Sequence, residues 1–145
     1  KLQFWTEFKV YVEQNSDLRP QSPRVQRNMN FSLGNSACHL SAAFLAKDKT
    51  AAVGIYIKGS SSKALYELLQ QDRKEIEQTI GSELIWRENP TTAGISIEKT
   101  DFDYSDKTQW QNCFQWMLDQ LCIWDKFFRI KVNELDLGQY EISDD

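Results

Sequence analysis

The single histidine of the chain, His39, is the residue best suited to acid–base chemistry, and it follows the turn-forming stretch FSLGNS at 31–36. Imidazole titrates near neutral pH, so a histidine near hydroxyls such as Ser36 and Ser41 can act as a general base or contact a phosphate. The alternative is a half-buried histidine bonded to a hydroxyl or carbonyl, because polar side chains in sheets are usually satisfied internally. Cys38 cannot pair with it, since strand neighbours point to opposite faces. We therefore predict no catalytic residue, and a structural and a binding role for His39 both stay open.

Basic side chains are the second group with chemical potential, and we predict that they contact DNA or RNA. Three arginines cluster in the proline-containing segment 16–28, and two lysines flank Asp48 in a polar turn. Each can hold a phosphate through a contact that is independent of base sequence. The predicted nucleic-acid-binding residues are Arg19, Arg24, Arg27, His39, Ser41, Lys47 and Lys49. In the alternative interpretation, the arginine segment is a solvated loop whose side chains pair with Glu13 or Asp17.

The net charge of −4 restricts such binding to a local surface. Phosphate binding needs a positive field, so we do not expect the domain as a whole to adhere to nucleic acid without specificity. Acidic residues gather towards the C-terminus, in segment 136–145. A local basic face is the form of nucleic-acid binding that this composition allows.

The cysteines do not indicate a metal site or a cofactor. Cys38, Cys113 and Cys122 are an odd number without a CxxC pair, and one histidine beside them does not supply the ligands that zinc needs. We predict reduced, buried thiols in a cytosolic protein, with no metal and no cofactor.

No segment predicts membrane insertion or secretion. No apolar run approaches ~18 residues, and the start of the chain lacks the apolar region of a signal peptide. We therefore expect a cytoplasmic protein without membrane contact. The length of 145 residues indicates a single domain at 1–135, followed by an acidic tail at 136–145 that we expect to fray. The chain begins with Lys1 and its apolar residues follow at once, which suggests that it was cut from a longer protein.

These residues must be positioned by an α+β fold, because helical and strand periodicities alternate along the chain. The helices are predicted at 2–14, 63–80 and 108–128, and the strands at 29–33, 38–46, 51–58, 83–88 and 94–99. The order α-β-β-β-α-β-β-α predicts a largely antiparallel five-stranded sheet with helices packed mainly on one face. Asp72 is the one polar interruption in the apolar stripe of the second helix.

The last predicted helix is the most aromatic element. Trp110, Phe114 and Trp124 repeat at helical spacing and are expected in the core, whereas Trp116 lies off this stripe and is interpreted as part of a contact surface. A protein-interaction or homodimer surface on this helix, without nucleic-acid contact, is therefore the main alternative function.

Two motifs indicate a family. The block FSLGNSACHLSA at 31–42 fits F-S-x-G-x-S-x-x-H-L-S-A, and IGSELIWRE at 80–88 fits I-G-x-x-L-x-W-x-E. With these motifs the chain, from its FWTEF helix to RIKV, resembles the family catalogued as domain of unknown function 4268. Members are typically bacterial or archaeal, and the domain is often C-terminal to a part that resembles a PD-(D/E)xK nuclease. The resemblance implies a role in nucleic-acid processing or genome defence, with an N-terminal nuclease-like domain as a partner in the full-length chain.

The predicted order α-β-β-β-α-β is also that of a PD-(D/E)xK nuclease core, but the residues of this chain do not support nuclease chemistry. Such enzymes hold Mg²⁺ with an aspartate on one strand and an acid two residues before a lysine on the next. The third strand here has Tyr56, Ile57 and Lys58, which keeps the lysine and lacks the acid, and Gly54 stands where members usually carry a glutamate. A degenerate or unrecognised nuclease is one alternative. The predicted function is a non-catalytic accessory domain that binds nucleic acid or a partner protein beside a nuclease-like module.

Overall fold

The computed structural model describes residues 1–59 and 62–134, which form the predicted α+β fold. The predicted acidic tail at 136–145 lies outside the described residues. The helices are α1 (Leu2–Asn15), α2 (Ser62–Gln71), α3 (Arg73–Ile80) and α4 (Trp110–Glu134). The strands are β1 (Asn28–Ser32), β2 (Cys38–Leu45), β3 (Thr50–Lys58), β4 (Ile85–Glu88) and β5 (Thr92–Lys99).

The five strands form one antiparallel sheet in the order β1-β2-β3-β5-β4. The first three strands follow one another as neighbours, whereas β5 lies between β3 and β4. Along β2 the even-numbered residues from Cys38 to Phe44 are buried, and the intervening residues are partly exposed. Successive side chains of a strand point to opposite faces, so only one face of the sheet lies against the core.

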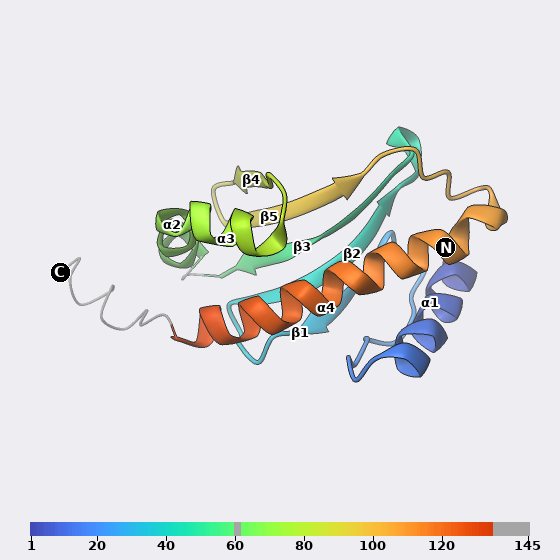
Figure 1. Cartoon of the computed structure of the whole chain (residues 1–145), viewed down its shortest axis with the longest axis horizontal. Coiled ribbons are helices and arrows are strands. Elements are labelled where there is room, and N and C mark those ends of the chain that lie inside the picture. The colour runs from blue at the N-terminus through green and yellow to red at the C-terminus, as the bar shows by residue number, and fades with distance from the viewer. Residues whose placement is uncertain (60–61, 135–145) are drawn as a thin grey trace.

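The helices cover this one face, as predicted (Figure 1). Helix α4 runs along β2 and β3, with α1 against its N-terminal half and α3 against its C-terminal half. The ring of Phe4 in α1 lies 5.0 Å from that of Phe44 in β2 and 5.1 Å from that of Trp110 in α4, measured between ring centres. Aromatic packing therefore joins both helices to the sheet.

The prediction of one continuous helix from 63 to 80 is wrong, because the chain turns at Asp72 and forms two helices. Asp72 has φ −104° and ψ 22°, which departs from helical geometry. Its carboxylate accepts a hydrogen bond from Nζ of Lys131 in α4 at 2.6 Å. The polar interruption in the stripe is therefore the point at which α3 turns to pack against α4.

The predicted burial of the thiols is wrong at Cys122, which is exposed, whereas Cys38 and Cys113 are buried. Cys122 follows buried Leu121 on α4, and a step of one residue moves a helical side chain well away from the apolar stripe. Trp116 is partly buried and packs against the core. None of the helices in the described ranges is long and apolar enough to span a bilayer.

Candidate nucleic-acid interface

The second face of the sheet is not covered by any helix within residues 1–59 and 62–134. Its floor is built from small side chains on β2, β3 and β5, namely Ser41, Ala43, Ala52, Gly54, Gly94 and Ser96. Gly54 is required there by the close approach of β5, because a Cβ atom at this position would lie 2.4 Å from the carbonyl oxygen of Ile95. A glutamate at this position would not fit without a backbone shift.

A row of directly paired residues crosses this uncovered face from β1 to β4. The strand register pairs Ser32 with His39, His39 with Tyr56, Tyr56 with Gly94, and Gly94 with Arg87. Residues directly opposite each other point to the same face of a sheet. Four strand spacings of ~4.8 Å make the row about 19 Å long.

His39 is the second residue of this row, on β2, and its ring lies against Tyr56. The ring centres are 5.3 Å apart and the ring planes are inclined by 40°. His39 is partly buried, and its side chain forms no hydrogen bond to any described residue. Every fully buried polar side-chain atom of the described chain does have a hydrogen-bond partner. The ring nitrogens of His39 therefore reach solvent. Burial and the nearby Lys58 ammonium lower the pKa of His39 below its ordinary value of 6.5, which favours the neutral imidazole.

A cavity of about 430 Å³, which we call the basic hollow, opens at the β1 end of the row. Its basic side chains come from three segments that are distant in sequence: Arg19, His39 and Lys58. Asn30, Asn35 and Ser36 add polar groups, and no carboxylate of the described chain lines it.

Backbone pairing fixes the elements that carry these side chains. The segment after Arg19 lies along the free edge of β1, where Pro20 bridges to Phe31 and the Gln21 N–H donates to the Asn30 carbonyl at 3.3 Å. At the other side of the hollow, the Lys58 N–H donates to the carbonyl of Ala37 at 2.8 Å.

A second cavity, of about 400 Å³, lies over the floor of small side chains, and we call it the sheet groove. Arg27 and Arg87 line it together with Tyr56. The Arg27 carbonyl accepts the Phe44 N–H at 2.9 Å, which fixes this residue beside β2. Nη2 of Arg87 lies 3.7 Å from Oε1 of Glu98, and its side chain is 65% exposed, so this ion pair is weak. Glu98 does not line the groove, nor does any other carboxylate from the described ranges.

The structure therefore brings together four of the seven predicted binding residues. Arg19 and His39 share the basic hollow, and Arg27 and Ser41 share the sheet groove. The two cavities adjoin where the His39 and Tyr56 rings meet. Among the described residues, neither Glu13 nor Asp17 forms an ion pair with the arginine segment, so the pairing alternative is not observed.

The other three predicted residues lie outside both cavities. Arg24 is exposed in the loop that connects the segment along the free edge of β1 to the start of β1. Lys47 and Lys49 occupy the turn between β2 and β3, where Lys49 has a positive φ of 50°. Six residue steps of extended strand, roughly 20 Å, separate His39 from Leu45 at the end of β2, and the turn with both lysines follows.

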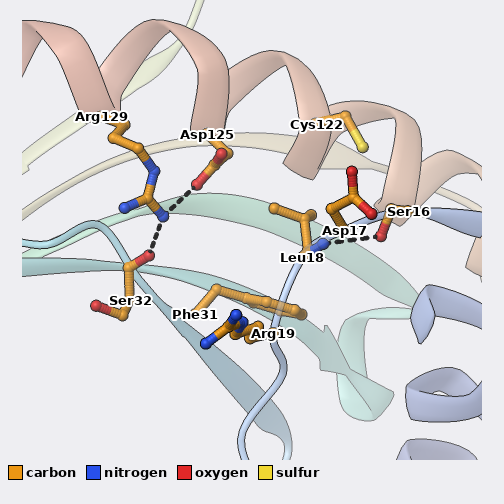
Figure 2. Close-up of a pocket in the computed structure, with 9 residues that line it drawn as sticks. All are labelled: Ser16, Asp17, Leu18, Arg19, Phe31, Ser32, Cys122, Asp125 and Arg129. Atoms are coloured by element: carbon orange, nitrogen blue, oxygen red, sulfur yellow. Dashed lines mark hydrogen bonds and ion pairs between the residues drawn. The ribbon is translucent and has the colours of Figure 1, made fainter.

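A larger cavity, of about 580 Å³, lies on the other side of β1, between the segment 16–19 and α4 (Figure 2). Its charges are mixed, because Asp17 and Asp125 line it as well as Arg19 and Arg129. The Arg129 guanidinium donates to the Ser32 carbonyl at 2.7 Å and to Asp125 at 2.9 Å, and Figure 2 shows it bridging the two. This arginine serves to hold β1 against α4.

The surroundings of Lys58 do not provide the acidic partners of a nuclease lysine. The basic hollow around it has no carboxylate in its lining. Within the described part of the chain, no three histidine, cysteine or acidic side chains are grouped so that they could hold a metal ion.

Sequence reasoning did not assign a binding role to Tyr56, Lys58 or Arg87. Alternation along β3 places Tyr56 and Lys58 on the same face as His39, so the sequence contained the information needed to identify these two residues. Arg87 reaches this face only through the β4–β5 register and the position of β5 beside β3, which a single sequence does not reveal.

The fold and its surface define an α+β domain with one helix-covered and one uncovered sheet face, the latter lined by basic and aromatic residues. The chain belongs to the family described as Domain of unknown function (DUF4268), whose model matches residues 1–131. No curated protein and no solved structure matches the chain significantly.

Proposed function

We propose that this domain binds nucleic acid through the uncovered face of its sheet, as a non-catalytic accessory domain that acts in the cytoplasm beside a nuclease-like module. One observation carries the proposal: the basic hollow and the sheet groove adjoin, contain four cationic side chains, and have no carboxylate in their linings. These cations are Arg19, Arg27, Lys58 and Arg87.

The absence of acidic side chains of the described residues from the linings of these two cavities supports a polyanionic ligand, because the chain as a whole is acidic. Its net charge is −4, so two adjoining cavities that are lined by cationic and by no acidic side chains of the described residues are not the consequence of its composition. Clefts lined by charges of one sign concentrate the field and attract the opposite charge. The four cations that line the two adjoining cavities can contact successive phosphates along a nucleic-acid strand.

Fluorescence anisotropy of labelled DNA and RNA tests the proposal. Binding should weaken between about 50 and 200 mM salt, since neutralised phosphates release counterions. Arg19→Ala and Arg27→Ala should each reduce the affinity and lower the salt slope by about one. Arg24→Ala is the matched control, because this arginine is in the same segment and outside both cavities.

Three results contradict the proposal. Absence of salt-sensitive binding to either nucleic acid removes the binding function. Equal effects of Arg24→Ala and Arg19→Ala remove this face as the binding surface. Cleavage of plasmid in Mg²⁺ or Mn²⁺, abolished by Lys58→Ala, contradicts a non-catalytic role and supports the nuclease alternative.

A protein-interaction function is the second candidate, and a surface between α3 and α4 favours it. Ile123 and Ile130 are 39% and 58% exposed, and with Phe127 they line a largely apolar cavity of about 480 Å³. Exposed apolar residues at helical spacing are typical of surfaces that pack against another chain. Sedimentation of the wild type and of Ile130→Glu decides whether this surface forms a homodimer: a dimer that the variant dissociates supports it, and a monomeric wild type contradicts it.

A further inference from the structure

We propose that the uncovered face selects single-stranded over double-stranded nucleic acid, by stacking a base on Tyr56 beside His39 and placing an adjacent phosphate in the basic hollow. This inference rests on the proposed function, which it refines by naming the class of ligand.

Tyr56 provides a stacking surface that the fold itself does not use. Its side chain is 41% exposed, and it stands on the uncovered face rather than in the core. The neighbouring His39 ring extends this surface, with 5.3 Å between the ring centres. Base–aromatic stacking contributes about 1–3 kcal/mol per base and tolerates any sequence, because every base has a flat π-face.

The floor next to Tyr56 leaves room for a base. Gly94 pairs directly with Tyr56 across β3 and β5, so no side chain projects from the sheet at that position. Gly54, two residues before Tyr56 on β3, and Ser96, diagonal to it on β5, are also small. A planar ring can therefore lie along the groove against Tyr56 without displacing protein atoms.

Basic groups flank this aromatic pair on both sides. His39 lines the basic hollow with Arg19 and Lys58, and Arg87 stands at the opposite end of the same row. A base on Tyr56 thus has the basic hollow on one side and Arg87, two strand spacings or about 10 Å away, on the other. A short segment of single strand fits this arrangement, with phosphates at the ends and a base in the middle.

A duplex cannot use the aromatic pair in this way. Its bases are stacked on one another and present only their edges in the grooves, so their flat faces are not accessible to Tyr56 except at the helix ends. Duplex binding would depend on the phosphate contacts alone, and the stacking contribution would be lost.

Anisotropy with fluorescein-labelled oligo(dT) and oligo(U) of about 12 nucleotides, compared with a hairpin duplex of equal phosphate number, tests the inference. We expect a single strand to bind about tenfold more tightly than the duplex. Tyr56→Ala should remove about tenfold of the single-strand affinity and leave the salt slope unchanged. Tyr56→Phe keeps the ring and should bind as the wild type does.

The outcomes separate this inference from the proposed function. If the duplex binds as tightly as both single strands, or if Tyr56→Ala has no effect, the inference fails; an Arg19→Ala effect in the same assay then leaves the proposed function standing. If no probe binds, both fail. The urea midpoint of Tyr56→Ala should match that of the wild type, because the side chain is outside the core.

Discussion

The ammonium group of Lys131 lies 2.6 Å from the carboxylate of Asp72, and this ion pair joins α4 to the turn between α2 and α3. The Lys131 side chain is only 15% exposed, and its hydrogen bond with Asp72 is the main cause that raises its pKa. We predict that Asp72→Ala lowers the free energy of unfolding by about 1–2 kcal/mol, because it leaves a partly buried cation without its closest partner. Urea denaturation measures this change.

The matched control is Glu75→Ala. Glu75 also faces Lys131, but at 3.5 Å and with 58% of its side chain exposed. Its removal should therefore lower the free energy of unfolding by less than the removal of Asp72 does. An equal or larger cost for Glu75→Ala would show that Asp72 has no special role.

Because β5 approaches β3 closely, we predict that substitutions at two glycines of the sheet differ strongly in their effect on stability. A Cβ at Gly54 would lie 2.4 Å from the Ile95 carbonyl oxygen, whereas one at Gly94 would lie 3.6 Å from that of Ile55, an ordinary contact. Gly54→Ala should therefore destabilise the domain by about 1–3 kcal/mol. Gly94→Ala should change stability by less than about 0.5 kcal/mol. Equal urea midpoints for the two variants would contradict the close approach.

Protonation of His39 is predicted to oppose folding. Burial and then Lys58 lower the pKa of its imidazole in the folded chain, while Arg19 lines the same hollow and Tyr56 packs against the ring. The unfolded chain consequently binds more protons just below pH 6.5. The stability due to neutral His39 is present above that pH and is lost as the pH falls through the folded-state pKa.

Urea unfolding of the wild type and of His39→Gln between about pH 5 and pH 8 measures this effect. The wild type should lose stability relative to the variant on acidification. NMR titration of the imidazole should give a midpoint below 6.5 that rises in Lys58→Ala. A midpoint at or above 6.5 in the wild type would disprove the assignment.

The three thiols are predicted to differ in reactivity. Burial raises the pKa of Cys38 to about 11 and that of Cys113 to about 12, so neither forms an accessible thiolate in the folded chain. Cys122 is exposed, although burial and two nearby aspartates also raise its pKa. A thiol reagent at pH 8 should modify Cys122 alone, slowly, and all three thiols in urea. Rapid modification of a second thiol without denaturant would contradict this burial.

Several features could be predicted from the sequence because they depend on local geometry. Alternation along 38–46 places successive side chains on opposite faces, and in the structure Leu40 is buried while His39 is partly exposed. A short turn joins β2 to β3, and His39 lies opposite Tyr56 in the resulting hairpin. Where periodicity was interrupted, as at Asp72, the sequence showed a polar residue but not the turn of the chain that accompanies it.

The sequence by itself determined the α+β class, the antiparallel hairpins, the helix-covered face and the family, because side-chain periods of 2 and 3.6 residues and short motifs are local properties. Only the tertiary structure decided which basic residues meet. The insertion of β5 between β3 and β4 brings Arg87 to the uncovered face, the β1 edge brings Arg19 beside Lys58, and the length of β2 keeps Lys47 apart from them. Strand order, and the register of strands that no short turn connects, arise from packing between distant segments, which no local pattern encodes.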